Sequence, residues 1–161
     1  KGRPADRRVA VLVADLDQAR SLAVVDERAA MLAAARWPGP LTMVLPAVAG
    51  SVEPTVGVRC PDHDLVRAVA AAVGPIATTS ANRSGDPTPV DAAAAAASLR
   101  TGPVDDLLVV DGGPCGGVPS TVVDLTVDPA VVLRVGSVTA ADLESVGIRV
   151  EPATVALGDD R

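Results

Sequence analysis

Short apolar runs alternate with polar, turn-forming segments along this chain of 161 residues. Continuous runs rich in Val and Leu predict buried strands, and Ala-rich stretches interrupted by polar residues predict helices. We expect strands at 8–13, 41–45, 56–60, 107–110, 121–125 and 131–135, with a further extended stretch at 75–79. We expect helices at 15–23, 26–36, 65–73, 91–99 and 139–146.

Local signals set several of these boundaries. Asp15 and Asp26 stand where a carboxylate can cap the first turn of a helix, and Gly74 can close the third helix. The Trp-Pro-Gly-Pro segment at 37–40 must end the second helix, because two prolines around a glycine cannot continue the helical hydrogen bonds. Interleaved strands and helices predict an α/β fold, and the uneven connections favour a mixed parallel and antiparallel sheet over a purely parallel one.

The composition excludes some functions. Hydrophobic residues make up 48% of the chain but aromatic residues only 1%, with one Trp and no Phe or Tyr. A core of Ala, Val and Leu argues against base-stacking platforms, which need several aromatic side chains. Fourteen Lys and Arg against twenty Asp and Glu give a net charge of −6, which argues against a broad nucleic-acid surface or an anionic-membrane surface. Any anion site must therefore be a local cluster.

Cysteine and histidine usage narrows the chemistry further. Cys60 and Cys115 lie far apart, which indicates neither a zinc ribbon nor a disulfide framework and favours a reducing, cytoplasmic location. No apolar run reaches the roughly 20 residues of a membrane span. His63 is the only histidine, so a His-rich metal site is excluded, and we expect this residue at the surface or at a helix start. No metal-ligand set is predicted.

Several cationic and hydroxyl side chains occupy positions where burial would cost free energy unless each binds a partner. Arg59 ends one predicted strand and Arg134 interrupts another, and a guanidinium there needs an anionic partner or a place at the sheet rim. Two interpretations stay open. Each arginine could pair with a nearby carboxylate such as Asp62 or Asp124, or the arginines could belong to a small anion pocket. Lys1 and Arg3 flank a glycine and would project on one face of an extended stretch.

Two loops offer further candidates. The segment Thr-Thr-Ser-Ala-Asn at 78–82 follows an extended stretch, and its hydroxyl and backbone N–H groups could hold phosphate oxygens, although such clusters are mostly turns. Ser120 opens a strand directly after the glycine-rich segment 112–117. Those glycines permit close approach of a ligand, but a flexible connection between strands is at least as common.

Six motifs together resemble a known family. They are KGRP at 1–4, WPGPLT at 37–42, VGVRCP at 56–61, TSANRSG at 79–85, STVVD at 120–124 and LRVG at 133–136. In this order and at similar spacing they resemble YrdC/TsaC-type threonylcarbamoyl-AMP synthases, from Lys1 to about Gly136. The resemblance implies a twisted mixed sheet with flanking helices around a concave, positively lined cleft.

The resemblance also implies an activity. The expected enzyme is a nucleotidyltransferase, an L-threonylcarbamoyladenylate synthase that joins L-threonine, bicarbonate and ATP, with Mg²⁺, and releases pyrophosphate. Partner proteins would then use the adenylate to modify adenosine in tRNA. By motif position, Lys1 and Arg3 would neutralise phosphate charge in catalysis, and the threonine-binding residues would be Arg59, Thr78 and Ser120. The nucleotide-binding positions would be Arg3, Arg7, Thr55, Ser80, Asn82, Thr88 and Arg134.

The chain departs from the family at two places. Arg7 and Leu12 stand where many relatives have Asn and His. Relatives also carry, before the KGRP segment, a stretch with a Pro-Thr-x-Thr-x-Tyr-Gly-Leu motif. We therefore expect residues 1–147 to be an N-terminally truncated YrdC-like domain with impaired activity in isolation, and 148–161 to be a C-terminal tail. The alternatives are a hydrogenase-maturation domain that handles carbamoyl-adenylate, and a non-catalytic module that binds RNA or nucleotide.

Overall fold

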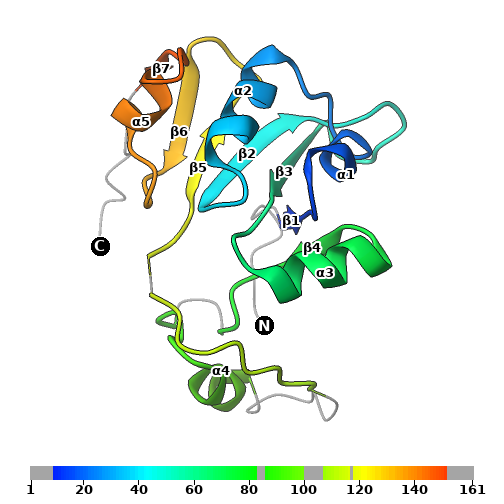
Figure 1. Ribbon diagram of the computed structural model, residues 1–161, viewed down its shortest axis with the longest axis vertical. Helices are drawn as coiled ribbons and strands as arrows, with labels where there is room; N and C mark the ends of the chain where they lie inside the picture. Colours follow the sequence, from blue (N-terminus) through cyan, green and yellow to red (C-terminus); the bar gives the residue numbers. More distant parts are fainter. Residues whose placement is uncertain (1–8, 83–85, 100–106, 117, 152–161) are drawn as a thin grey trace, which may run out of the picture. The chain divides into compact units, whose positions relative to one another are not determined.

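The computed structural model describes residues 9–82, 86–99, 107–116 and 118–151. Five helices and seven strands lie in this part of the chain (Figure 1). The helices are α1 (Leu16–Arg20), α2 (Glu27–Arg36), α3 (Asp64–Val73), α4 (Ala92–Leu99) and α5 (Ala140–Glu144). The strands are β1 (Ala10–Leu12), β2 (Leu41–Pro46), β3 (Thr55–Arg59), β4 (Ile76–Thr78), β5 (Thr121–Asp124), β6 (Ala130–Arg134) and β7 (Val150–Glu151).

The strands form one mixed sheet in the order β4-β1-β3-β2-β5-β6-β7. β1 runs parallel to β3, β2 runs antiparallel to β3 but parallel to β5, and β6 runs antiparallel to β5. The predicted mixed α/β sheet is thus confirmed. Because of these directions, β1, β3 and β6 end at the same edge of the sheet at which β2 and β5 begin. The candidate site lies at this edge.

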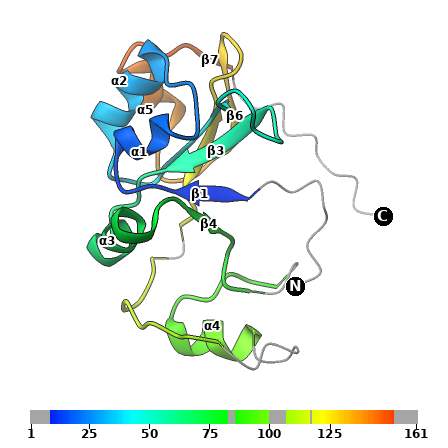
Figure 2. The ribbon, with the colours of Figure 1, turned by 90° about the vertical axis from the view of Figure 1, so that its right-hand side faces the viewer.

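One face of the sheet carries the main core. Leu41, Met43 and Leu45 alternate along β2 and are fully or almost fully buried, together with Leu32 of α2 and Leu143 of α5. Figure 2 shows α1, α2 and α5 on the same side of the strands. Burial of a side chain such as Leu32 contributes roughly 2 kcal/mol. The alternate residues of β2 therefore face away from this core.

Local capping explains where the helices begin. The Asp15 carboxylate accepts a hydrogen bond from the backbone N–H of Gln18, and the Asp26 carboxylate accepts one from Ala29, both at 2.8 Å. These caps confirm the starts expected from the sequence. His63 is the exposed N-cap residue of α3 and makes no side-chain capping bond, which agrees with its expected surface position at a helix start.

The described residues fall into two compact units. The larger one contains Ala10–Ala77 and the described chain from Pro119 to Glu151, and the other includes the described residues between Thr78 and Val118. In the smaller unit the Asp91 carboxylate caps α4 by accepting from Ala94 N at 2.7 Å. A strand predicted at 107–110 is wrong, because these residues form no ladder and Leu108 is exposed. An apolar run makes a strand only where a neighbouring strand can pair with it.

The chain after residue 147 also differs from expectation. A tail was predicted from 148, but Ile148 is buried in the main core and β7 pairs in parallel with β6, Ala130 opposite Val150. The short apolar spacing at this end gives too little periodicity to indicate a strand. The ordered sheet therefore continues to Glu151.

Candidate functional site

Arg59 is the last residue of β3 and lies half-buried at the sheet edge described above. Its Nε donates a hydrogen bond to the carbonyl of Gly39 at 3.0 Å. Burial, and then the nearby charge of Arg134, lower the pKa of the Arg59 guanidinium. Arginine stays protonated at neutral pH even so, which means that two neighbouring cations coexist at this edge.

Arg134 is the last residue of β6, at the same edge, and donates two hydrogen bonds to Ser120. Its Nε donates to the Ser120 carbonyl at 2.9 Å, and its Nη2 donates to the Ser120 hydroxyl oxygen at 2.8 Å. Arg134 is more exposed than Arg59, and its partial burial still lowers the pKa of its guanidinium. The predicted residues Arg59, Ser120 and Arg134, which lie far apart in sequence, thus meet at one end of the sheet.

Neutral oxygens accept the hydrogen bonds that both guanidinium groups make to described residues. Among the described residues, neither arginine forms an ion pair with a carboxylate. Oδ1 of Asp62 lies 3.8 Å from Nη1 of Arg67. The Asp124 carboxylate accepts hydrogen bonds from the backbone N–H and the side-chain hydroxyl of Thr126. The interpretation that Asp62 or Asp124 neutralises the arginines is therefore wrong. Two cations without a counter-ion from the described chain favour an anionic ligand.

The Trp-Pro-Gly-Pro loop between α2 and β2 supports this edge. Gly39 donates its N–H to the carbonyl of Cys60 at 2.9 Å while its own carbonyl accepts from Arg59. A Cβ at Gly39 would lie 2.2 Å from the backbone oxygen of Arg36, so only glycine fits there. The next carbonyl, that of Pro40, accepts the N–H of Thr121 at 2.9 Å. One loop therefore positions Arg59 on one side and the start of β5 on the other.

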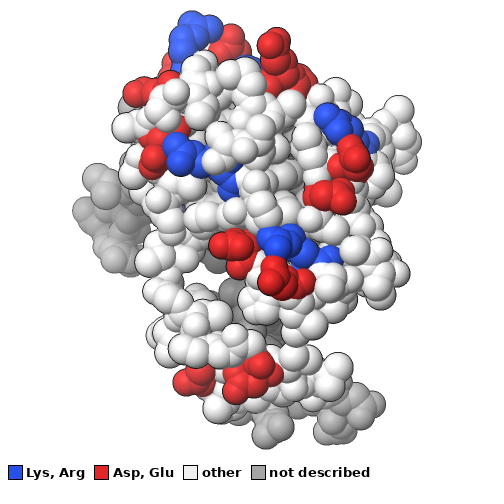
Figure 3. Space-filling view, viewed as in Figure 1, with Lys and Arg blue, Asp and Glu red and all other residues white. Residues whose placement is uncertain are grey.

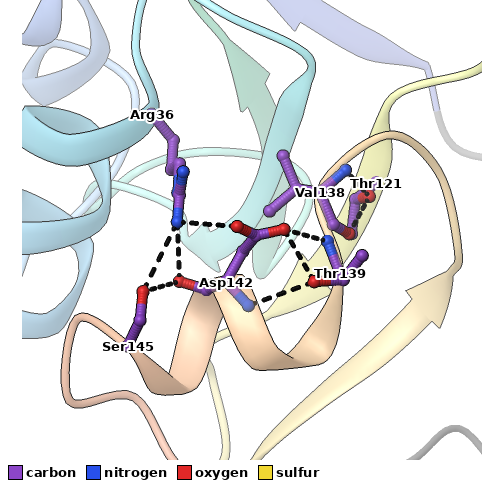
Figure 4. A network of polar contacts seen from close by, with 6 residues as sticks. All are labelled: Arg36, Thr121, Val138, Thr139, Asp142 and Ser145. Atoms are coloured by element: carbon purple, nitrogen blue, oxygen red, sulfur yellow. Dashed lines mark hydrogen bonds and ion pairs between the residues drawn. The ribbon is translucent and has the colours of Figure 1, made fainter.

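The segment after β6 is fixed against the start of β5. The fully buried Thr121 hydroxyl donates to the carbonyl of Val138 at 2.6 Å and accepts the N–H of Val138 (Figure 4). It also accepts the N–H of Gly136 at 3.1 Å. A Cβ at Gly136 would lie 2.3 Å from the backbone oxygen of Pro119. This close approach holds Arg134 in place above Ser120.

Sequence reasoning missed Thr42. It is 5% exposed, and its Oγ1 lies 3.0 Å from the hydroxyl oxygen of Ser120. Continuing the pairing of β2 with β3 by one residue places Thr42 opposite Arg59. A signal was present, because a polar residue between Leu41 and Met43 marks the sheet face opposite the core, but it did not identify the neighbours.

Cys60 follows Arg59 in the chain, but its side chain is buried in a small hydrophobic cluster with Val13 and Ala19. Its thiol is buried and donates to the carbonyl of Ala14 at 3.2 Å, and burial raises the pKa of the thiol. A buried thiol with a raised pKa is a poor nucleophile. Both Cys60 and Cys115 are free cysteines.

The other predicted residues are distributed as follows. Thr55 begins β3, so it lies at the opposite end of that strand from Arg59. Thr78 ends β4, and Ser80, Asn82 and Thr88 belong to the smaller unit. Lys1, Arg3 and Arg7 lie outside the described residues. Their ligand contacts, and the predicted concave cationic cleft, stay predictions.

Asn82 stands out within the smaller unit. Its side chain is 6% exposed, and its Nδ2 donates to the carbonyl of Asp86 at 2.6 Å. Its buried Oδ1 has no hydrogen-bond partner among the described residues. A buried amide oxygen normally has a partner, so this atom is suited to a donor group of a ligand.

The other described arginines of the larger unit form ion pairs with carboxylates. Arg36 of α2 donates its Nη2 to the Asp142 carboxylate at 3.1 Å and to the Asp142 carbonyl at 2.9 Å (Figure 4). Figure 3 shows basic side chains lying beside acidic ones on the face that it views. Within the described residues no three His, Cys, Asp or Glu side chains form a group that could hold a metal ion. None of the described helices is both long and apolar enough for a membrane span.

Comparisons with known proteins agree with the motif pattern. Residues 1–136 match the Sua5/YciO/YrdC family, whose description is telomere recombination. A Pyrococcus abyssi protein named threonylcarbamoyl-AMP synthase is 40% identical over 165 residues, which cover 95% of this chain and 47% of that protein. A Bacillus subtilis protein of the same name is 40% identical over 156 residues, which cover 91% of this chain and 44% of that protein.

A solved structure shows the same fold. The crystal structure of P. abyssi Sua5 complexed with L-threonine has a TM-score of 0.83 and 38% identity, over 94% of this chain and 47% of that one. The chain thus spans less than half the length of the relatives just described. The family match covers most of the chain, includes all six motifs, and agrees with the mixed sheet that carries Arg59, Ser120 and Arg134. This chain belongs to the Sua5/YciO/YrdC family.

Proposed function

We propose that this chain is the catalytic region of an L-threonylcarbamoyladenylate synthase, which makes threonylcarbamoyl-AMP for the modification of adenosine in tRNA. The observation that carries the proposal is the pair Arg59 and Arg134, which meet only neutral oxygens among the described residues. L-Threonine, bicarbonate and ATP are all anionic or carry a carboxylate. Relatives that are 40% identical and bear the synthase name support the same activity.

The reaction needs alignment more than a protein nucleophile. The amine of L-threonine combines with bicarbonate to give a carbamate and water. A carbamate oxygen then attacks the α-phosphorus of ATP, the bond between the α-phosphorus and the bridging oxygen to the β-phosphate breaks, and pyrophosphate leaves. Fixed cations and hydrogen-bond donors favour this step by bringing two anions together and by neutralising charge on the phosphates.

Arg59 is suited to the threonine carboxylate. Its guanidinium Nε donates to the Gly39 carbonyl, and among the described residues neither Nη1 nor Nη2 makes a hydrogen bond or ion pair. Two such donors can hold a carboxylate through parallel hydrogen bonds. Thr78 and Ser120 would complete the threonine subsite.

The nucleotide would contact Thr55, Ser80, Asn82, Thr88 and Arg134, with Lys1, Arg3 and Arg7 near the phosphates. The Oδ1 of Asn82, which has no hydrogen-bond partner among the described residues, supports a ligand contact in the Ser-Ala-Asn loop. Mg²⁺ is expected to accompany ATP. The described residues contain no group of three His, Cys, Asp or Glu side chains suited to a metal ion, so they do not fit a protein-held Mg²⁺ site.

The product would pass to partner proteins that modify tRNA, since an acyl-adenylate hydrolyses readily in water. Two free cysteines support a reducing, cytoplasmic location. The basic residues of the larger unit that pair with carboxylates, such as Arg20 with Asp17 at 2.6 Å, do not favour a broad nucleic-acid surface.

Pyrophosphate release by the purified chain, assayed at a protein concentration high enough to detect the reduced activity expected of the isolated chain, tests this proposal. Release should require L-threonine, bicarbonate and ATP together, and mass spectrometry should find threonylcarbamoyl-AMP. Arg59→Ala should abolish most of the threonine-dependent release, whereas the matched control Arg20→Ala, at an exposed ion pair, should retain it. Release that needs no threonine would contradict the proposal. Use of carbamoyl phosphate instead would favour the hydrogenase-maturation alternative, and steeply salt-dependent tRNA binding without ATP would favour an RNA-binding module.

A further inference from the structure

Thr42 sits between the two arginines on the sheet face that is turned away from the core. It lies opposite Arg59 by strand register, and it pairs with Val122, which in turn pairs with Arg134. Its orientation is set by its neighbours on both sides. A Cβ built on Gly57 of β3 would lie 3.7 Å from the Thr42 methyl carbon, while the Thr42 hydroxyl faces Ser120 before β5.

The hydroxyl groups of Thr42 and Ser120 share one hydrogen bond, in which either group could be the donor. A serine hydroxyl has one proton to donate and two lone pairs that accept. Nη2 of Arg134 can only donate, so it occupies one lone pair of Ser120 Oγ. Among the described residues, Ser120 Oγ is the only hydrogen-bond partner of Thr42 Oγ1. If Ser120 donated to Thr42, the Thr42 proton would therefore be left without an acceptor inside the strand.

The positions of Thr42 and Ser120 indicate which of the two hydroxyl protons has no acceptor within the protein. Thr42 and Ser120 are buried to a similar degree, at 5% and 6% exposed, but Thr42 is the second residue of β2, whereas Ser120 precedes β5 at the sheet edge, beside the guanidinium of Arg134. A ligand held by the two arginines can reach Ser120 more readily than a residue inside β2. An unmatched donor costs least where a ligand can accept from it.

We propose that Thr42 is a positioning residue that donates to Ser120 and thereby makes the Ser120 hydroxyl a hydrogen-bond donor to the carboxylate of L-threonine. This inference rests on the proposed function. With both lone pairs of Ser120 Oγ occupied by Arg134 and Thr42, its proton points in the remaining direction, toward the ligand. Ser120 then selects a ligand atom that accepts hydrogen bonds, such as a carboxylate oxygen, and disfavours an ammonium group.

Ligand binding to matched variants tests the role. Thr42→Val keeps the side-chain volume but removes the donor, and it should weaken L-threonine binding roughly tenfold, as expected for one hydrogen bond, with ATP affinity unchanged. Thr42→Ser restores the hydroxyl and should bind within about twofold of the wild type. Thr126→Val, which removes an exposed hydroxyl that donates to Asp124, serves as the control and should bind L-threonine normally.

(R)-1-Aminopropan-2-ol, which is L-threonine without the carboxylate carbon and its oxygens, separates positioning from general damage. Its affinity, measured by NMR titration, should be the same for the wild type and Thr42→Val. Equal L-threonine affinity of these two proteins would overturn the inference, and so would an equal loss for L-threonine and the amino alcohol. Failure of the wild type to bind L-threonine would instead contradict the proposed function.

Neutron diffraction of the unliganded chain, exchanged into heavy water, decides the proton direction without any ligand. The deuterium on Thr42 Oγ1 should point at Ser120 Oγ, and the deuterium on Ser120 should point away from Thr42. A Ser120 deuterium directed at Thr42 Oγ1 would overturn the inference even if L-threonine binds.

Discussion

Arg36 and Arg59 show two ways in which one sheet domain uses an arginine. Arg36 joins α2 to α5 by donating to the carboxylate and the carbonyl of Asp142, and Thr139 holds the same carboxylate by donating from its backbone and hydroxyl (Figure 4). Arg59 donates to a neutral carbonyl and has a second cation, Arg134, beside it. The first arginine is neutralised by the fold itself, whereas the second keeps a charge that a ligand can neutralise.

Effects on stability and effects on ligand binding can therefore be separated by substituting the two arginines. A compensated arginine contributes to the free energy of unfolding, because removing it leaves a carboxylate with fewer partners. An uncompensated pair of cations opposes folding, and its retention is explained by a ligand. Substitutions in the two regions should therefore affect different measurements.

The largest effect is expected at Gly136, which lets the segment after β6 approach β5. In Gly136→Ala the new Cβ would meet the backbone of 119–121 at 2.3 to 2.6 Å, so the backbone must move. We expect a loss of roughly 2–3 kcal/mol in the free energy of unfolding, measured in urea, together with weaker threonine binding. Gly116→Ala is the matched control, because a Cβ there meets no atom within 4 Å. Equal free energies of unfolding for the two variants would contradict the view that close backbone contacts at Gly136 stabilise this edge of the sheet.

Arg59→Ala comes next and should act on binding alone. Loss of a charge-assisted contact predicts roughly 10- to 100-fold weaker L-threonine binding by calorimetry, with a smaller effect on ATP. The melting temperature should stay the same or rise, because a partly buried cation without a counter-ion has been removed. Ser80→Ala should show the reverse preference, weakening ATP more than threonine. If both variants lowered the two affinities equally, the proposed division of the pocket would be wrong.

Arg36→Met should show the opposite result. Methionine retains much of the apolar stem but none of the donors to Asp142, so we expect a loss on the order of 1 kcal/mol in the free energy of unfolding. Threonine affinity of the folded variant should match the wild type. A clear loss of threonine binding without loss of stability would contradict the contrast between the two arginines.

Much of the fold could be predicted from local sequence. The caps at Asp15 and Asp26, the prolines after α2 and the apolar runs of β2 and β3 act over a few residues, so the predicted bounds of these elements agree with the observed ones to within three residues. The strand expected at 107–110 and the missed β7 show the limit. Pairing depends on which edge is available, and a short apolar run does not contain that information.

The site could be predicted only in part. Arg59 and Arg134 are conspicuous because a charge at the end of an apolar strand needs an explanation. The register that brings Ser120 to Arg134 joins residues fourteen positions apart, and the contact of Thr42 with Ser120 joins residues 78 apart. Such contacts depend on strand order, which no local pattern fixes.

The smallest expected effect is a pH dependence at the α2–α5 junction. Hydrogen bonds from the Thr139 side chain and backbone, and then the charge of Arg36, lower the pKa of Asp142 in the folded state. Its contribution to stability is thus complete above the ordinary carboxylate pKa of about 4 and is lost as the pH falls through the lower folded value. The melting temperature of Asp142→Asn should lie below that of the wild type at pH 7, and the gap should narrow in acid. A gap that does not change with pH would contradict this assignment.

A crystal structure of this chain with L-threonine would show whether Arg59 and Ser120 bind the ligand. We expect the threonine carboxylate within hydrogen-bonding distance of the Arg59 guanidinium and the Ser120 hydroxyl, with Arg134 still hydrogen-bonded to Ser120. L-Threonine bound elsewhere, with Arg59 turned toward a carboxylate of the protein, would contradict this expectation.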